Sequence, residues 1–126
     1  MFAAWFLRFS RRAAQWLLLP ALAIVVWGEL TPHPPEPVDV WDKLLHFIAY
    51  FGLSGIALVA FRPGRRAIYA TSGLIFAGGV LEIVQGMVGR DASWGDELAN
   101  TLGAVTGCLL GWAIVRLLER AARGQA

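Results

Sequence analysis

The sequence predicts an all-α membrane protein, a four-transmembrane-helix bundle with its N- and C-termini in the cytoplasm. Hydrophobic residues make up 57% of the 126-residue chain and charged residues 16%, and the mean hydropathy is +0.57, which is too apolar for an ordinary water-soluble domain. The apolar residues fall into four segments of 18 to 22 residues, and about 20 such residues cross a hydrocarbon core of ~30 Å. We therefore expect a single transmembrane domain, 1–126, with lipid covering its outer faces.

Each apolar segment is expected to form one helix, because it is too long and too continuously apolar for the alternating strands of a membrane barrel. The expected helices cover residues 13–30, 44–61, 67–88 and 98–118. Pro20 predicts a kink in the first helix, and the proline-rich stretch 31–37 ends that helix. A ridge of small residues on the last helix predicts close helix packing, at Gly103, Gly107 and Gly111.

The basic residues set the expected orientation. Nine of the 11 lysines and arginines lie before the first segment, between the second and third, or at the end of the fourth. By the positive-inside rule this face is cytoplasmic, and the chain is a multi-pass protein of the inner (cytoplasmic) membrane. No cleavage signal follows the first segment, so it is expected to remain as a helix. Aromatic residues are not interleaved with the arginines, so no nucleic-acid partner is expected.

Polar side chains on the second helix belong to the first part of a candidate ligand-binding site. Ionisable groups inside a membrane are costly, and by default they indicate a functional site. Asp42, His46 and Tyr50 recur every four residues and therefore share one helix face, with Lys43 next to Asp42.

The third and fourth helices supply the rest of the expected site. Glu82 and Gln85 share a face of the third helix, and Arg90 follows the end of that helix. Asp96 and Asn100 lie four residues apart at the start of the fourth helix. Counted along the helices, Glu82 and Asn100 reach a depth of about 6 to 9 Å below the outer face, as His46 does. We expect one polar pocket that is open to the outside.

An ordered set of motifs within residues 42–111 carries a family resemblance. The motifs are Asp42-Lys43-x-x-His46-x-x-x-Tyr50, Glu82-x-x-Gln85 followed by Arg90, and Asp96-x-x-x-Asn100-x-x-Gly103-x-x-x-Gly107. Through them the chain resembles the bacterial VanZ-like family of integral membrane proteins. The resemblance implies a bacterial inner-membrane protein of the cell envelope, and it suggests a link to antibiotic resistance because the namesake is associated with resistance to the glycopeptide teicoplanin.

Several of these residues also have structural explanations. Asp96 follows Ser93 in a capping-box pattern, and acids in a first turn offset the helix dipole. His46 fits a core histidine, and Asn100 fits an interhelical hydrogen bond worth ~0.6–2 kcal/mol. Glu82 is harder to explain in this way, because an acid with apolar neighbours must be protonated, paired or hydrated.

Three functions are open for the expected pocket. The first is recognition of an anionic envelope lipid or a cell-wall-related ligand, favoured by Lys43, Arg90 and two outward-pointing helix N-termini. The second is an enzyme with His46 and Glu82 as candidate catalytic acid–base residues, for which the sequence offers no clear nucleophile. The third is a small proton-linked transporter that uses the same pair. We expect ligand binding, with membrane lipids as partners, no cofactor and no metal; a homo-oligomer and a purely structural role stay open.

Overall fold

The chain folds into four α-helices in a computed structural model that describes residues 2–31, 39–88 and 93–124. The helices are α1 (Phe2–Leu30), α2 (Asp39–Phe61), α3 (Arg65–Met87) and α4 (Trp94–Gly124). All four are long and apolar enough to cross a membrane. The predicted class, an all-helical protein with four membrane-spanning helices, is confirmed to that extent.

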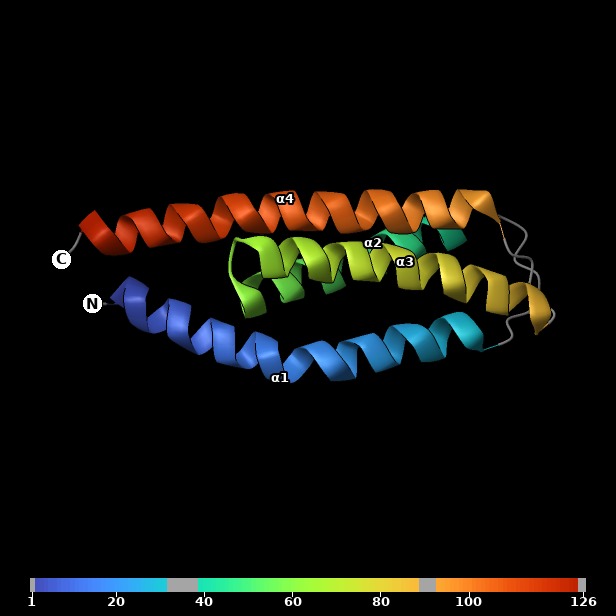
Figure 1. Cartoon of the computed structure of the whole chain (residues 1–126), viewed down its shortest axis with the longest axis horizontal. Helices are drawn as coiled ribbons and strands as arrows, with labels where there is room; N and C mark the ends of the chain where they lie inside the picture. The colour runs from blue at the N-terminus through green and yellow to red at the C-terminus, as the bar shows by residue number, and fades with distance from the viewer. Residues whose placement is uncertain (1, 32–38, 89–92, 125–126) are drawn as a thin grey trace.

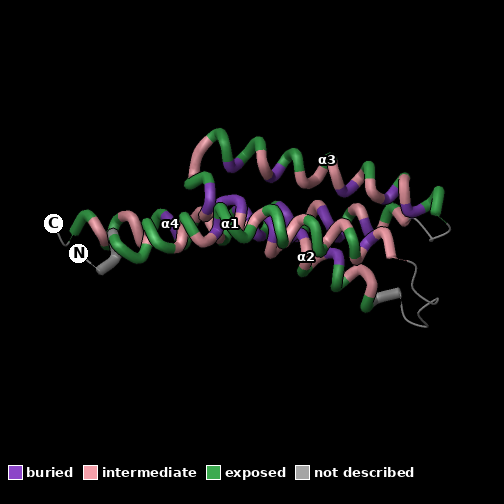
Figure 2. Tube along the Cα trace, turned by 90° about the horizontal axis from the view of Figure 1, so that it is seen from below, coloured by how far each residue is buried: buried purple, intermediate pink, exposed green. Residues whose placement is uncertain are grey.

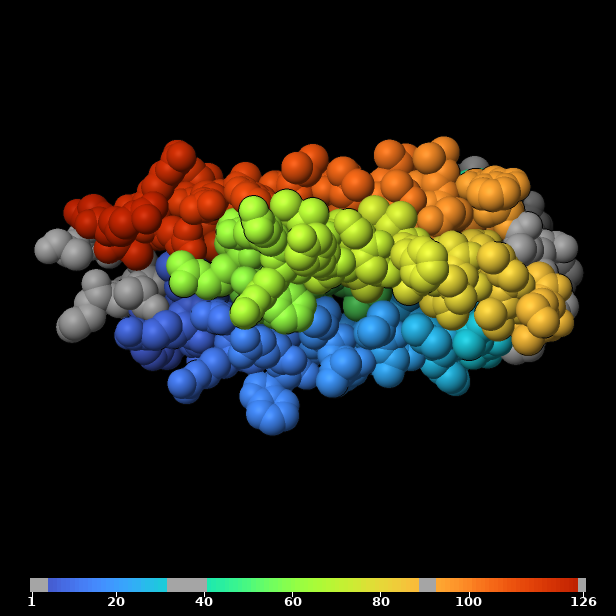
Figure 3. All heavy atoms as spheres, viewed as in Figure 1, coloured from blue at the N-terminus to red at the C-terminus, as the bar shows by residue number. Residues whose placement is uncertain are grey.

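The helices run alongside one another, and the chain reverses direction between one helix and the next (Figure 1). The start of α1 and the end of α4 lie at one end of the bundle, which we call the terminal end (Figure 1). The opposite end, where α1 and α3 finish and α2 and α4 begin, we call the polar end. Figure 3 shows α3 between α1 and α4 on one face of the molecule.

The first and last helices are much longer than the apolar segments from which they were predicted. α1 begins at Phe2 rather than near residue 13, and α4 extends to Gly124 rather than 118. The added turns carry arginines, which are good helix formers and need no apolar environment. At 1.5 Å per residue, α1 spans about 43 Å and α4 about 46 Å, so both exceed a ~30 Å hydrocarbon core. α3 ends at Met87, one residue before the expected boundary.

Pro20 lies inside α1 and does not end the helix. Its missing N–H and its ring disturb the hydrogen bond to the preceding turn, which permits a bend. The ribbon of α1 is bowed along its length in Figure 1. The first helix therefore continues as one span through the proline.

The closest helix packing is between α2 and α4, and glycines on α4 make it possible. A Cβ atom added at Gly103 would collide with the backbone carbonyl of Phe47, and one at Gly107 would collide with that of Phe51. Further along, a Cβ at Gly111 would lie 2.9 Å from Cδ2 of Leu58. The predicted glycine ridge is thus confirmed as a packing surface, and it brings the polar groups of α2 and α4 into contact.

The outer surface is apolar, as a lipid-facing surface must be. Buried stretches lie on the helix sides that face their neighbours (Figure 2), whereas large apolar side chains such as Trp16, Phe76 and Ile83 are exposed. Trp41 and Trp94 are also exposed and lie at the polar end, where tryptophans commonly sit at the membrane–water interface. Hydrophobic burial between the helices is correspondingly modest.

Polar contacts link the helices at the terminal end. The Ala60 carbonyl, in the last turn of α2, accepts hydrogen bonds from Arg11 Nε at 3.3 Å and from Gln15 Nε2 at 3.2 Å. Arg62 follows α2 with φ of 65°, a left-handed conformation that often ends helices. Its guanidinium reaches Glu119 of α4 at 2.6 Å.

Candidate functional site

A histidine and an asparagine meet at the centre of the polar end. The Nδ1 atom of His46 on α2 lies 3.0 Å from Oδ1 of Asn100 on α4. His46 is 6% exposed and Asn100 is fully buried. The close α2–α4 packing explains this contact. Gly103 of α4 packs against the backbone of Phe47 of α2. His46 directly precedes Phe47, and Asn100 lies three residues before Gly103. The predicted proximity of these two side chains is confirmed.

Glu29 of α1 is a member of the site that the sequence interpretation did not include. Its Oε1 lies 3.5 Å from His46 Nδ1, and its Oε2 accepts a hydrogen bond from the Tyr50 hydroxyl at 3.4 Å. Its backbone carbonyl accepts a 2.8 Å hydrogen bond from Gln85 Nε2. Glu29 is 7% exposed although it stands one residue from the end of its helix. The first helix therefore contributes to the site, and the signal was an acid at the end of an apolar segment.

Asp42, Lys43 and Asp96 lie beside the imidazole. Asp42 Oδ1 is 3.9 Å from His46 Nε2, one helical turn away on α2. The Lys43 ammonium lies 3.8 Å from Asp96 Oδ1, which joins α2 to α4 by an ion pair longer than a hydrogen bond. The Ser93 hydroxyl accepts a hydrogen bond from the Asp96 backbone N–H at 3.2 Å, so the predicted serine cap of α4 is confirmed.

Glu82 brings α3 into the site. Its Oε2 accepts a 3.3 Å hydrogen bond from the backbone N–H of Ser93, at the start of α4. Within the described residues, Glu82 Oε1 and Asp96 Oδ1 are both buried and accept no hydrogen bond. A buried carboxylate oxygen without a hydrogen bond is costly in free energy.

Gly78 and Glu97 complete the site, and sequence reasoning overlooked both as site residues. The Glu97 carboxylate accepts a 3.5 Å hydrogen bond from Asn100 Nδ2. A Cβ atom added at Gly78 would lie 3.0 Å from Glu97 Oε2, 3.1 Å from the Tyr50 hydroxyl and 3.2 Å from Asn100 Nδ2. The glycine therefore makes room on α3 for polar groups of α2 and α4. Because glycine has no side chain, the sequence gives no signal of this role.

We call this arrangement the polar cluster, and every helix contributes to it. Eight of the nine residues predicted as ligand-binding lie in it; Arg90, the ninth, lies outside the described residues. The cluster consists of Glu29, Asp42, Lys43, His46, Tyr50, Gly78, Glu82, Gln85, Asp96, Glu97 and Asn100.

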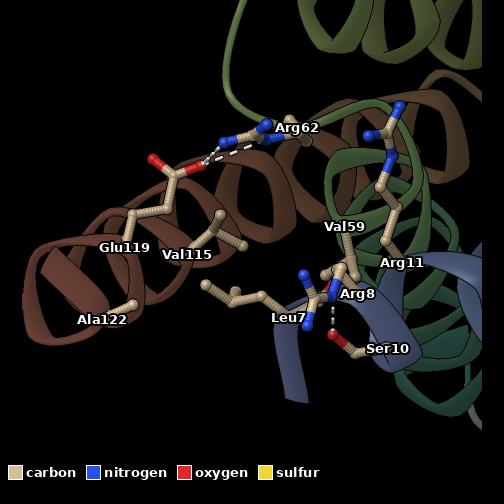
Figure 4. Close-up of a pocket in the computed structure, with 9 residues that line it drawn as sticks. All are labelled: Leu7, Arg8, Ser10, Arg11, Val59, Arg62, Val115, Glu119 and Ala122. Carbon is tan, nitrogen blue, oxygen red and sulfur yellow. Dashed lines mark hydrogen bonds and ion pairs between the residues drawn. The ribbon is translucent and has the colours of Figure 1, made fainter. Parts of the chain in front are cut away.

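Most polar groups of the cluster are buried against one another, rather than lining the outward-open pocket that the sequence suggested. Lys43 and Asp42 are the more accessible members, with side chains 33% and 36% exposed. A hollow of about 280 Å³ lies instead at the terminal end (Figure 4). Its lining includes arginines of α1, Arg62 and the acidic Glu119 of α4 (Figure 4).

Acidic side chains outnumber basic ones in the cluster. Its described residues carry five carboxyl groups, on Glu29, Asp42, Glu82, Asp96 and Glu97, against the single ammonium of Lys43 and the titratable imidazole of His46. One N or O ligand atom from each of Asp42, His46 and Asp96 lies within 4.8 Å of the other two. Such a set can hold a proton or a cation. Among the described residues, these three have side chains close enough together to bind one metal ion.

The chain matches no protein-family model, and searches of curated proteins and of solved structures found no match either.

Proposed function

We propose that this chain is a bacterial inner-membrane protein of the VanZ-like kind that binds a ligand of the cell envelope in the polar cluster. In this proposal the polar end faces outward and both chain ends are cytoplasmic. The distribution of arginines supports the orientation, because Arg8, Arg62, Arg116 and Arg120 all belong to the terminal end.

The observation that carries the proposal is the burial of His46 and Asn100 among carboxylates from separate helices. Helix association in a membrane needs only small residues and a few interhelical hydrogen bonds, and the glycines of α4 already provide the close packing. Glu29, Glu82 and Asp96 add acids that cost free energy to bury. This surplus of ionisable groups supports a ligand site rather than a purely structural one.

The proposed ligand is an anionic envelope lipid or a cell-wall-related molecule with a phosphate group. Two features favour an anion: the N-termini of α2 and α4 point towards the polar end, and Lys43 stands at the accessible side. The carboxylates of the cluster oppose an anion at close range. A phosphate would therefore bind near Lys43, and it would need further positive charge to offset the carboxylates.

Native mass spectrometry of the detergent-purified protein tests this proposal. We expect the wild-type chain to carry a copurified lipid, and Lys43→Gln and His46→Gln to lose it. Glu119→Gln is the matched control, because it removes an acid of α4 at the terminal end and leaves the polar cluster unchanged. Equal lipid occupancy in the wild type and both cluster variants would contradict binding in the polar cluster.

A second candidate function, proton-linked chemistry or transport, is supported by the two carboxylate oxygens of Glu82 and Asp96 that accept no hydrogen bond among the described residues. Buried acids of this type serve as relays in membrane transporters and as acid–base groups in enzymes. Proteoliposomes with an internal pH-sensitive dye would report proton flux down an imposed gradient. Flux that is absent in Glu82→Gln and retained in Glu119→Gln would favour this function over binding alone.

A further inference from the structure

The hydrogen bonds around Asn100 determine how the imidazole of His46 is oriented. Asn100 Nδ2 donates to Glu97 Oε2 at 3.5 Å, so its Oδ1 is the atom that faces His46. A carboxamide oxygen only accepts hydrogen bonds. His46 Nδ1 must therefore carry the proton in the 3.0 Å contact. In the neutral imidazole, the lone pair then resides on Nε2.

Carboxylates lie beside the Nε2 atom of His46. Asp42 Oδ1 lies 3.9 Å from it, and one oxygen of Asp96 lies within 4.8 Å of a ligand atom of His46 and of one of Asp42. A lone pair opposite two carboxylates is repulsive unless a positive charge lies between them. Neighbouring ligand atoms around a tetrahedral Zn²⁺ are ~3.4 Å apart for bonds of ~2.1 Å. Modest movements of the side chains would bring the three ligand atoms to this spacing.

Asp96 provides a second observation that points to a cation. It is only 3% exposed, and its Oδ1 accepts no hydrogen bond among the described residues. The Lys43 ammonium is 3.8 Å from this oxygen, which is too long for a hydrogen bond. A buried carboxylate oxygen of this kind has the coordination capacity that a metal ion would use.

We propose that Asp42, His46 and Asp96 bind a divalent metal ion of the Zn²⁺ type, with Asn100 as the residue that positions the imidazole. The ligand set is one imidazole nitrogen and two carboxylate oxygens, which suits a borderline first-row ion such as Zn²⁺. Metal-bound histidines usually donate their other ring N–H to an oxygen acceptor, as His46 does to Asn100. Three protein ligands leave one position for water or for a ligand oxygen.

Lys43 competes with the metal for Asp96. Its side chain is 33% exposed and flexible, so the ammonium can turn towards water when a metal neutralises the carboxylate. A bound metal would also supply the positive charge that a phosphate needs in this acidic cluster. The metal site goes beyond the proposed envelope ligand and stands without it, because the Zn²⁺ titration does not require a lipid to be bound.

The test is Zn²⁺ titration by calorimetry of the full chain in detergent after treatment with a chelator. We expect a single Zn²⁺ per chain in the wild type and at least about tenfold weaker binding in Asp42→Asn and Asp96→Asn. Lys43→Gln should bind Zn²⁺ more tightly than the wild type, because the competing ammonium is gone. Glu119→Gln, which changes an acid at the terminal end, should bind as the wild type does.

Co²⁺ in place of Zn²⁺ gives a spectroscopic readout. Visible absorption bands of four-coordinate Co²⁺ should appear in the wild type, shift in Asn100→Ala and vanish in His46→Gln. Asp42 is partly exposed, so Asp42→Asn should fold even if the buried His46 variant does not. Absence of saturable Zn²⁺ binding by the folded wild type, or unchanged affinity in Asp42→Asn and Asp96→Asn, would overturn the proposal.

Discussion

The imidazole of His46 and the carboxamide of Asn100 face each other across the α2–α4 interface, with Nδ1 and Oδ1 3.0 Å apart. Both residues are buried, and the glycine ridge of α4 brings their helices close enough for this contact. A direct interhelical hydrogen bond therefore lies at the centre of an otherwise acidic cluster. The chemistry of the polar cluster depends on this pair, and the pair depends on the close packing of α2 on α4.

Loss of the asparagine should destabilise the bundle. In Asn100→Ala the ring N–H of His46 loses its nearest acceptor, and we expect a cost of about 1–3 kcal/mol. Thermal or denaturant unfolding in detergent measures the change. Thr106→Ala is the control on the same helix, because the exposed Thr106 hydroxyl bonds to the Leu102 carbonyl one turn before it. Equal stability of the two variants would argue against the buried hydrogen bond.

The glycine ridge should be intolerant of larger residues. A Cβ at Gly107 would strike the backbone carbonyl of Phe51, so Gly107→Leu must push α2 and α4 apart. Overpacking of this kind costs about 1–3 kcal/mol or more. Gly73→Leu is the matched control, since a Cβ at position 73 on α3 has no atom within 4 Å. Unfolding midpoints of the two variants should differ, and similar midpoints would be inconsistent with close packing of α2 on α4.

Gly78 and Gly79 give a sharper comparison within one helical turn of α3. A Cβ at Gly78 would crowd three polar atoms at 3.0 to 3.2 Å, whereas one at Gly79 would meet Glu97 atoms at an ordinary 3.8 Å. We expect Gly78→Ala to weaken Zn²⁺ or lipid binding because Tyr50 and Asn100 must shift. Gly79→Ala should bind normally. The reverse ranking would place the polar cluster elsewhere on α3.

The orientation of the helices is tested by reporter fusions. Alkaline phosphatase, which is active only outside the cytoplasm, should be active when fused after Asp91 and inactive when fused after Gly64. The reason is that the arginine-rich turn stays on the cytoplasmic side. Activity after Gly64 with silence after Asp91 would reverse the proposed faces.

The sequence predicted the four helices because long, continuously apolar segments cross a membrane as helices rather than as the alternating strands of a barrel. It underestimated α1 and α4 because hydropathy measures the span within lipid, whereas the helix continues through turns that carry Arg8 and Arg120. The largest boundary errors therefore lie at the terminal end, where turns that carry arginines remain helical beyond the apolar segments.

Spacing also placed most of the polar cluster, since residues four apart share a face and depth follows from the helical rise. It did not place Glu29, because an acid near a helix end looks like an ordinary interfacial residue. Gly78 has no side chain to attract attention, and its role depends on which groups of α2 and α4 lie opposite. Whether Glu29 and Gly78 face the polar cluster depends on how the helices are rotated about their axes. Periodicity along a single helix does not determine that rotation.

The most direct measurement of the central claim is ¹⁵N NMR of the histidine side chain in the His33→Gln variant, where His46 is the only histidine. At a pH where the ring is neutral, we predict a proton on Nδ1, bonded to Asn100, and a lone pair on Nε2. Zn²⁺ should then shift the Nε2 signal. A ring protonated on Nε2 instead, with Nδ1 bare, would contradict both the hydrogen bond and the metal site.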